Sequence, residues 1–160
     1  MPEREENRKL IMVSSCLLGV HAKYDGTFTN KNDLLMKYSH LGKYLPFCPE
    51  QLGGLATPRA PVEIIDGSKA INSMGEEVTS QFIKGAEQSL YLTEIFPVKA
   101  AILKERSPSC GAHKIYDGSF SHVIKEGKGV TAAMLGANGI PLYSEEDLTD
   151  ELLRELLELK

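Results

Sequence analysis

The chain has 160 residues, of which 42% are apolar and 25% charged. This length and composition are typical of a single globular domain with a hydrophobic core, and we expect residues 1–160 to form one domain. No apolar run reaches the ~18 residues of a membrane span, and the charged start lacks a signal-peptide core, so we expect a cytoplasmic protein. The net charge of −4 argues against a stable nucleic-acid partner, which needs a basic surface.

In chain order, the first expected elements are two strands, a helix and a hairpin. Residues 9–15, KLIMVSS, form a short apolar run typical of a buried strand. Residues 30–41 repeat apolar side chains at helical spacing behind a capping asparagine, Asn32. Residues 43–47, KYLPF, are a second expected strand, and the Asp-Gly pair within residues 62–72 predicts a hairpin turn.

The second half alternates helices with strands. Apolar side chains step by four before Pro97, which predicts a helix that ends there. The expected elements are a helix over 76–96, a strand over 98–104, a loop over 105–120, a helix over 129–139, a strand over 140–143 and an acidic helix capped by Ser144. This alternation predicts an α/β fold, a three-layer α/β sandwich with a mainly parallel, Rossmann-like sheet.

Each of the three cysteines follows a predicted strand. Cys16, Cys48 and Cys110 lie at or just beyond the carboxyl ends of the first three strands of the expected parallel sheet. The carboxyl ends of parallel strands share one edge, where ligands bind in open α/β folds. Because an odd number of cysteines in a cytoplasmic chain favours ligands or nucleophiles over disulfides, we expect one shared site.

Three converging thiolates can hold a metal in two ways. The sequence lacks paired CxxC motifs, so a zinc site would need the three thiolates with His21 or His113. An iron–sulfur cubane normally has four cysteine ligands, and three would leave one iron without a protein ligand. Such an open position is typical of a catalytic site, where iron can act as a Lewis acid toward a soft sulfur atom.

The residues beside these cysteines suit proton transfer and ligand binding. Glu50 stands two positions after Cys48 and is expected to carry protons, with a salt bridge to Arg59 as its alternative role. Ser107 and Ser109 precede Cys110 and either relay protons, orient substrate or stabilise a turn. Gly111, like Gly53 and Gly54, lets backbone approach a ligand closely or forms a turn.

Four stretches of the sequence together resemble a known family. They are VSSCLLG with KYDG, then CPEQLGGLATPR, then LKERSPSCG with IYDGSF, and finally GKGVTAAMLGANGIPLYSEED. The chain is similar along Lys9 to Asp147 to the DUF523 family, whose characterised members are thiouracil desulfurases. The joint presence of CPEQLGG and SPSCG carries most of this resemblance.

The resemblance implies an oxygen-sensitive [4Fe-4S] cluster held by Cys16, Cys48 and Cys110. The fourth iron would take the sulfur of a thiolated pyrimidine, and water would replace that sulfur to give uracil and hydrogen sulfide. It implies further that Glu50 is the acid/base and that Ser107 assists proton transfer. On this basis Ser109 and Gly111 are expected to contact the small thiolated nucleobase.

Two rival hypotheses come from the same residues. A non-catalytic metal or iron–sulfur protein would bind metal without desulfuration. A metal-free cysteine enzyme would use Cys110 as nucleophile beside His113, with Cys16 and Cys48 dispensable.

Overall fold

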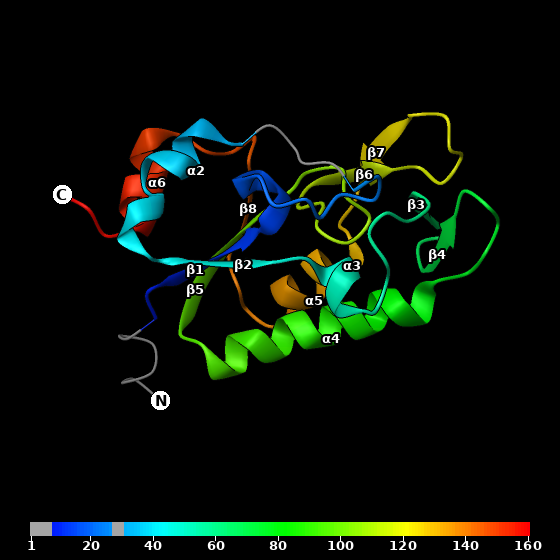
Figure 1. Ribbon diagram of the computed structural model, residues 1–160, viewed down its shortest axis with the longest axis horizontal. Helices are drawn as coiled ribbons and strands as arrows, with labels where there is room; N and C mark the ends of the chain where they lie inside the picture. Colours follow the sequence, from blue (N-terminus) through cyan, green and yellow to red (C-terminus); the bar gives the residue numbers. More distant parts are fainter. Residues whose placement is uncertain (1–7, 27–30) are drawn as a thin grey trace.

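The computed structural model describes residues 8–26 and 31–160, which fold around a central parallel sheet (Figure 1). Residues 1–7 and 27–30 lie outside this description. The charged start, expected to lack a signal peptide, and the first residue of the helix predicted over 30–41 therefore lie outside the described residues. Within the described part of the chain, no helix has the length and apolar character to cross a membrane.

The central sheet contains all four strands that the sequence predicted. Its order is β2 (Tyr44–Phe47), β1 (Leu10–Ser14), β5 (Val98–Leu103) and β8 (Leu142–Ser144), and every neighbouring pair is parallel. Residues 11–13 of β1 have no exposed surface, because helices cover both faces of the sheet. A continuous apolar run is the expected signature of such a strand.

Helices pack on both faces of the sheet and make three layers (Figure 1). On one face, Met12 of β1 shares a core with residues of α5 (Val130–Ala137) and α4 (Thr79–Ile95). On the other face, Ile11 and Val13 pack against α2 (Asp33–Lys37) and α6 (Asp150–Leu156). Alternate residues of β1 thus serve opposite cores, and the predicted α/β sandwich is confirmed.

Two antiparallel hairpins flank the sheet. The predicted hairpin is formed by β3 (Val62–Ile65) and β4 (Lys69–Asn72), and Asp66 and Gly67 at its turn have φ angles of 51° and 74°. These left-handed angles are the reason for an Asp-Gly pair there. A second hairpin, of β6 (Lys114–Tyr116) and β7 (Ile124–Glu126), was not predicted: β6 lies in the expected loop over 105–120, and no element was expected at β7. Its strands have three residues each, too few for a period-two pattern to be recognised.

The expectation that Ser144 caps the last helix is wrong. Ser144 ends β8, where it pairs with Leu103, and it is fully buried. The helix begins at Asp150, and the Thr149 side chain caps it by accepting a hydrogen bond from Leu152 N at 3.0 Å. Both residues are good helix caps, so local sequence could not choose between them, whereas the register of β8 did.

Two short helical elements were not predicted, because each spans only about one turn. The 3₁₀ turn η1 (Ser15–Leu18) follows β1 at once, and α3 (Pro49–Leu52) follows β2 after Cys48. A further turn, η2 (Ser39–Leu41), continues α2. The first two of these turns place two of the three cysteines.

Candidate active site

The three cysteines follow three adjacent strands of the sheet. Cys16 lies in η1 directly after β1, Cys48 follows β2 and precedes α3, and Cys110 lies in the loop after β5. Burial raises the pKa of the Cys110 thiol, and the neighbouring thiols of Cys16 and Cys48 raise it further. The three cysteines thus lie at the carboxyl ends of adjacent strands, at one edge of the sheet.

Burial makes the thiols of Cys48 and Cys110 hard to ionise without a cation. Cys110 is 4% exposed, and the hydroxyls of Ser14 and Ser109 only partly offset the effect of burial on its pKa. Burial is also the main reason why the pKa of Cys48 is raised. Thiols of this kind stay protonated near neutral pH, and a bound metal displaces their protons. A raised pKa disfavours Cys110 as a metal-free nucleophile.

A hydrogen-bonded chain links Glu50 to the loop of Cys110. Ser109 Oγ donates to Glu50 Oε2 at 3.0 Å and lies 3.1 Å from Ser107 Oγ. Ser109 Oγ is also 3.8 Å from Cys110 Sγ. On its other side, Glu50 Oε1 accepts a hydrogen bond from Arg59 Nε at 3.1 Å. The structure therefore contains both the expected salt bridge and a path along which protons can pass.

The loop of Cys110 is organised by the side chain of Ser107. Ser107 Oγ accepts hydrogen bonds from the backbone N–H groups of Ser109 at 3.2 Å and Cys110 at 3.0 Å. The start of α5 completes the loop, because the N–H groups of Thr131 and Ala132 donate to the Ser109 carbonyl. The free donors of a helix N-terminus thus fix the backbone beside the cysteine.

The buried carboxylate of Glu105 closes the same loop. Glu105 is 2% exposed, and its Oε1 accepts hydrogen bonds from His113 N at 2.9 Å and Lys114 N at 3.0 Å. Burial alone raises the pKa of Glu105, but these N–H donors, helped by Ser144 and His113, bring it below its usual value. Sequence reasoning missed Glu105, since a single acid in a charged loop gives no signal of burial.

Two of the glycines serve close backbone packing. A Cβ on Gly111 would lie 2.5 Å from the Lys114 carbonyl oxygen, inside the loop. A Cβ on Gly53 would lie 2.1 Å from the Gln81 carbonyl oxygen, in α4. The lack of a side chain at Gly53 is therefore required where α3 meets α4, as well as allowing a turn.

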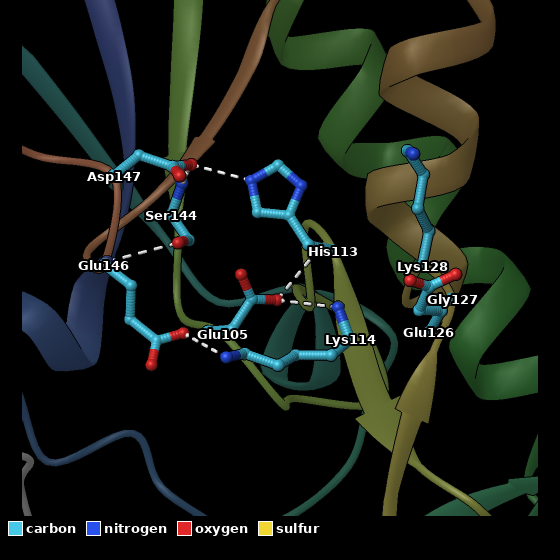
Figure 2. Close-up of a pocket in the computed structure, with 9 residues that line it drawn as sticks. All are labelled: Glu105, His113, Lys114, Glu126, Gly127, Lys128, Ser144, Glu146 and Asp147. Carbon is cyan, nitrogen blue, oxygen red and sulfur yellow. Dashed lines mark hydrogen bonds and ion pairs between the residues drawn. The ribbon is translucent and has the colours of Figure 1, made fainter.

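His113 lies in a separate open cavity of about 660 Å³, next to the carboxyl end of β8 (Figure 2). Its Nε2 is 2.7 Å from Asp147 Oδ2, and Figure 2 shows the ring directed at this carboxylate. The thiol of Cys110 instead lies near Ser14 and Ser109. The structure thus does not supply the contact that a Cys110–His113 pair would need. The cavity is lined by Glu105, His113, Lys114, Glu126, Gly127, Lys128, Ser144, Glu146 and Asp147.

The chemistry of the donor set fits a cluster better than one ion. Across residues 8–26 and 31–160, no three His, Cys, Asp or Glu side chains are grouped closely enough to hold one metal ion. Zinc needs all its ligands at about 2.0–2.3 Å, whereas each thiolate of a cubane binds a different iron. Thiols that come from three different strand ends therefore suit a cluster better than a single ion.

The fold and site define a class: a parallel α/β domain with three cysteines and a carboxylate–serine chain at the carboxyl edge of its sheet. The 2-thiouracil desulfurase family model matches residues 11–147, and the chain belongs to this family. The chain is similar to a solved structure described as the [4Fe-4S]-dependent thiouracil desulfidase TudS (DUF523Vcz). The identity is 41% and the TM-score 0.86, over 93% of this chain and 99% of that one. It is also 40% identical to the uncharacterized protein YbbK of Bacillus subtilis strain 168, over 89% of this chain and all of that protein.

Proposed function

We propose that this protein is a thiouracil desulfurase that depends on a [4Fe-4S] cluster. Membership of the 2-thiouracil desulfurase family and the likeness to a [4Fe-4S]-dependent desulfidase support this activity. The observation that supports this activity at the site is the position of three cysteines at adjacent strand ends, next to the hydrogen bond between Glu50 and Ser109. The net reaction is hydrolysis, in which thiouracil and water give uracil and hydrogen sulfide.

Cys16, Cys48 and Cys110 would hold the cluster. When bound, a cubane with three cysteine ligands supplies one open iron, a Lewis acid with affinity for the soft sulfur of a thiocarbonyl. The position of the three cysteines after the adjacent strands β2, β1 and β5 supports this assignment.

Glu50 and the two serines would hold and move the protons of the attacking water. Glu50 Oε2 accepts from Ser109 Oγ, so a proton taken from water can be shared along Ser109 and Ser107. Ser109 is 2% exposed, which favours a role as the link in this chain. Ser107 is more exposed and is the hydroxyl better placed to meet a substrate.

We propose that Ser109 and Gly111 contact the substrate through their backbone atoms. The side chain of Ser109 is engaged by Glu50, and Gly111 is buried within its loop. The substrate would therefore meet this loop through its backbone rather than through the Ser109 hydroxyl. From the charged start and the net charge of −4, we further propose a cytoplasmic protein without a stable nucleic-acid partner.

Anaerobic preparation tests the proposed function. The protein is purified without oxygen, its iron and sulfide are quantified, and sulfide release from 2-thiouracil and 4-thiouracil is measured. We expect about four irons per chain, a broad visible absorption band and release of one sulfide for each uracil formed. A protein that binds iron without releasing sulfide is a non-catalytic cluster protein. One that binds only zinc, or no metal, contradicts the proposal.

A further inference from the structure

Arg59 joins separate segments of the site through its guanidinium. Its Nε donates to Glu50 Oε1 at 3.1 Å, and its Nη2 donates to the Ala22 carbonyl oxygen at 2.9 Å. Its Nη1 donates to the Ala56 carbonyl oxygen at 3.2 Å and to Thr57 Oγ1 at 2.8 Å. The planar guanidinium is thereby held by four hydrogen bonds in three directions.

Two of these bonds connect the segments that carry cysteines. Ala22 follows Cys16 by six residues, and its carbonyl oxygen is also 3.8 Å from the thiol sulfur of Cys48. The backbone N–H of Arg59 donates to the carbonyl of Tyr24 in the same segment. The segment after Cys16 and the turn after Cys48 therefore meet on the side chain of one arginine.

The Arg59–Glu50 ion pair is buried. The Arg59 side chain is 7% exposed and the Glu50 side chain 12% exposed. Removing one partner would therefore leave the other as a buried charge that water solvates poorly. A lysine would keep the charge but would present a single ammonium group in place of the fork that reaches Glu50, Ala22 and Thr57. The arrangement depends on the shape of the guanidinium as well as on its charge.

We propose that Arg59 is a positioning residue of the active site, which holds Glu50 on Ser109 and ties the Cys16 segment to the Cys48 turn. The inference rests on the proposed function, since it acts through the residues assigned there. The Arg59 guanidinium donates its hydrogen bonds to Glu50, Ala22, Ala56 and Thr57, so it acts on the site through these groups. Without the guanidinium, the Glu50 carboxylate would lose the hydrogen bond that orients it, and the segments after Cys16 and Cys48 would be held together less firmly.

The test compares Arg59→Lys with Arg154→Lys, both loaded with cluster under anaerobic conditions. Arg154 lies on α6, where its bonds go to Tyr38 and to the Lys160 carbonyl, so it is a matched control away from the cysteines. We expect kcat of Arg59→Lys to fall about ten- to a hundredfold with KM within roughly twofold of wild type. We also expect its cluster absorbance to decay several times faster in the presence of an iron chelator.

A double variant tests whether Arg59 acts through Glu50. If it does, adding Arg59→Lys to Glu50→Gln changes kcat little further, because the two residues act as a unit. If the double variant loses kcat by the product of the two single losses, or if Arg59→Lys leaves kcat unchanged, the claim that Arg59 positions Glu50 is wrong. An unchanged rate of cluster decay overturns the tie between the cysteine segments.

These outcomes can be separated from failure of the proposed function. If the wild-type protein releases no sulfide, the desulfurase proposal fails, while the cluster-decay comparison still tests the tie. If circular dichroism shows that Arg59→Lys does not fold, Thr57→Val is used in its place, since it removes one Nη1 partner and keeps the charge. It is expected to shift both measurements in the same direction by a smaller factor, and no shift contradicts the inference.

Discussion

Gly129 lies directly against the backbone of Ser109. A Cβ on Gly129 would stand 2.4 Å from the Ser109 carbonyl carbon and 2.8 Å from the Cys110 backbone nitrogen. These atoms belong to the loop that the start of α5 holds in place, so they cannot move aside without moving Cys110.

Gly129→Ala should therefore reduce stability and disturb the cysteine loop. We expect the free energy of unfolding to fall by about 1–3 kcal/mol, the usual cost of overpacking, as measured by urea denaturation. Gly136→Ala, within α5, is the control, because a Cβ there would meet only the Leu142 side chain, at 3.2 Å. It should be neutral or slightly stabilising, because Ala favours a helix over Gly. Equal effects of the two substitutions would contradict the close contact.

Each cysteine should be needed for iron binding if the cluster has three ligands. Replacing Cys16, Cys48 or Cys110 singly by Ala is expected to lower the iron content of anaerobically prepared protein well below that of wild type, with no sulfide release. The measurement is iron per folded chain, with circular dichroism as the control for folding. A Cys48→Ala protein with full iron content and activity would remove Cys48 from the ligand set. Loss of function confined to Cys110 would instead favour the thiol enzyme.

Ser109→Ala should slow turnover more than it weakens substrate binding. It removes the donor to Glu50 Oε2 and interrupts the chain to Ser107. We expect kcat to fall by about a hundredfold, within the range for general acid–base groups, with KM little changed. Ser80→Ala is the control, because Ser80 is an exposed serine of α4 whose hydroxyl donates to its neighbour Gln81 Oε1 at 3.0 Å.

Ser107→Ala should add a loss of stability that Ser109→Ala lacks. Ser107 Oγ accepts from two backbone N–H groups, those of Ser109 and Cys110. Its removal should lower the free energy of unfolding by about 1–2 kcal/mol, because those buried donors lose their acceptor. Unfolding curves of the two variants make the comparison. An undiminished stability of Ser107→Ala would mean that the loop does not depend on this hydroxyl.

The carboxylate of Glu105 should make stability depend on pH. Because the folded pKa of Glu105 lies below its ordinary value of 4.5, its stabilisation is fully present above that value and is lost as pH falls through the folded pKa. Glu105→Gln should lower the free energy of unfolding at neutral pH by about 1–3 kcal/mol and flatten its decline in acid. Urea midpoints between about pH 7 and pH 3 measure this. Glu87→Gln, on the exposed face of α4, is the control, and an equally steep acid decline in Glu105→Gln would contradict the role.

Local patterns were sufficient to predict the framework of the fold. The apolar runs before Cys16 and Cys110 predicted β1 and β5, and Pro97 marked the end of α4 near where the structure has it, at Ile95. The second hairpin and the start of α6 could not be predicted in the same way. The hairpin strands are too short for a pattern, and Ser144 and Thr149 compete equally as caps until the sheet takes Ser144.

Burial and periodicity are local properties of the chain, so they predicted the order of the main strands and helices and the position of each cysteine after a strand. The partners of the site residues, in contrast, depend on how distant segments pack together. Arg59 and Glu50, Ser109 and Glu50, and Glu105 with the N–H groups of its loop are brought together by chain reversals and helix packing. The distances between such groups depend on the whole fold, and no spacing in the sequence encodes them.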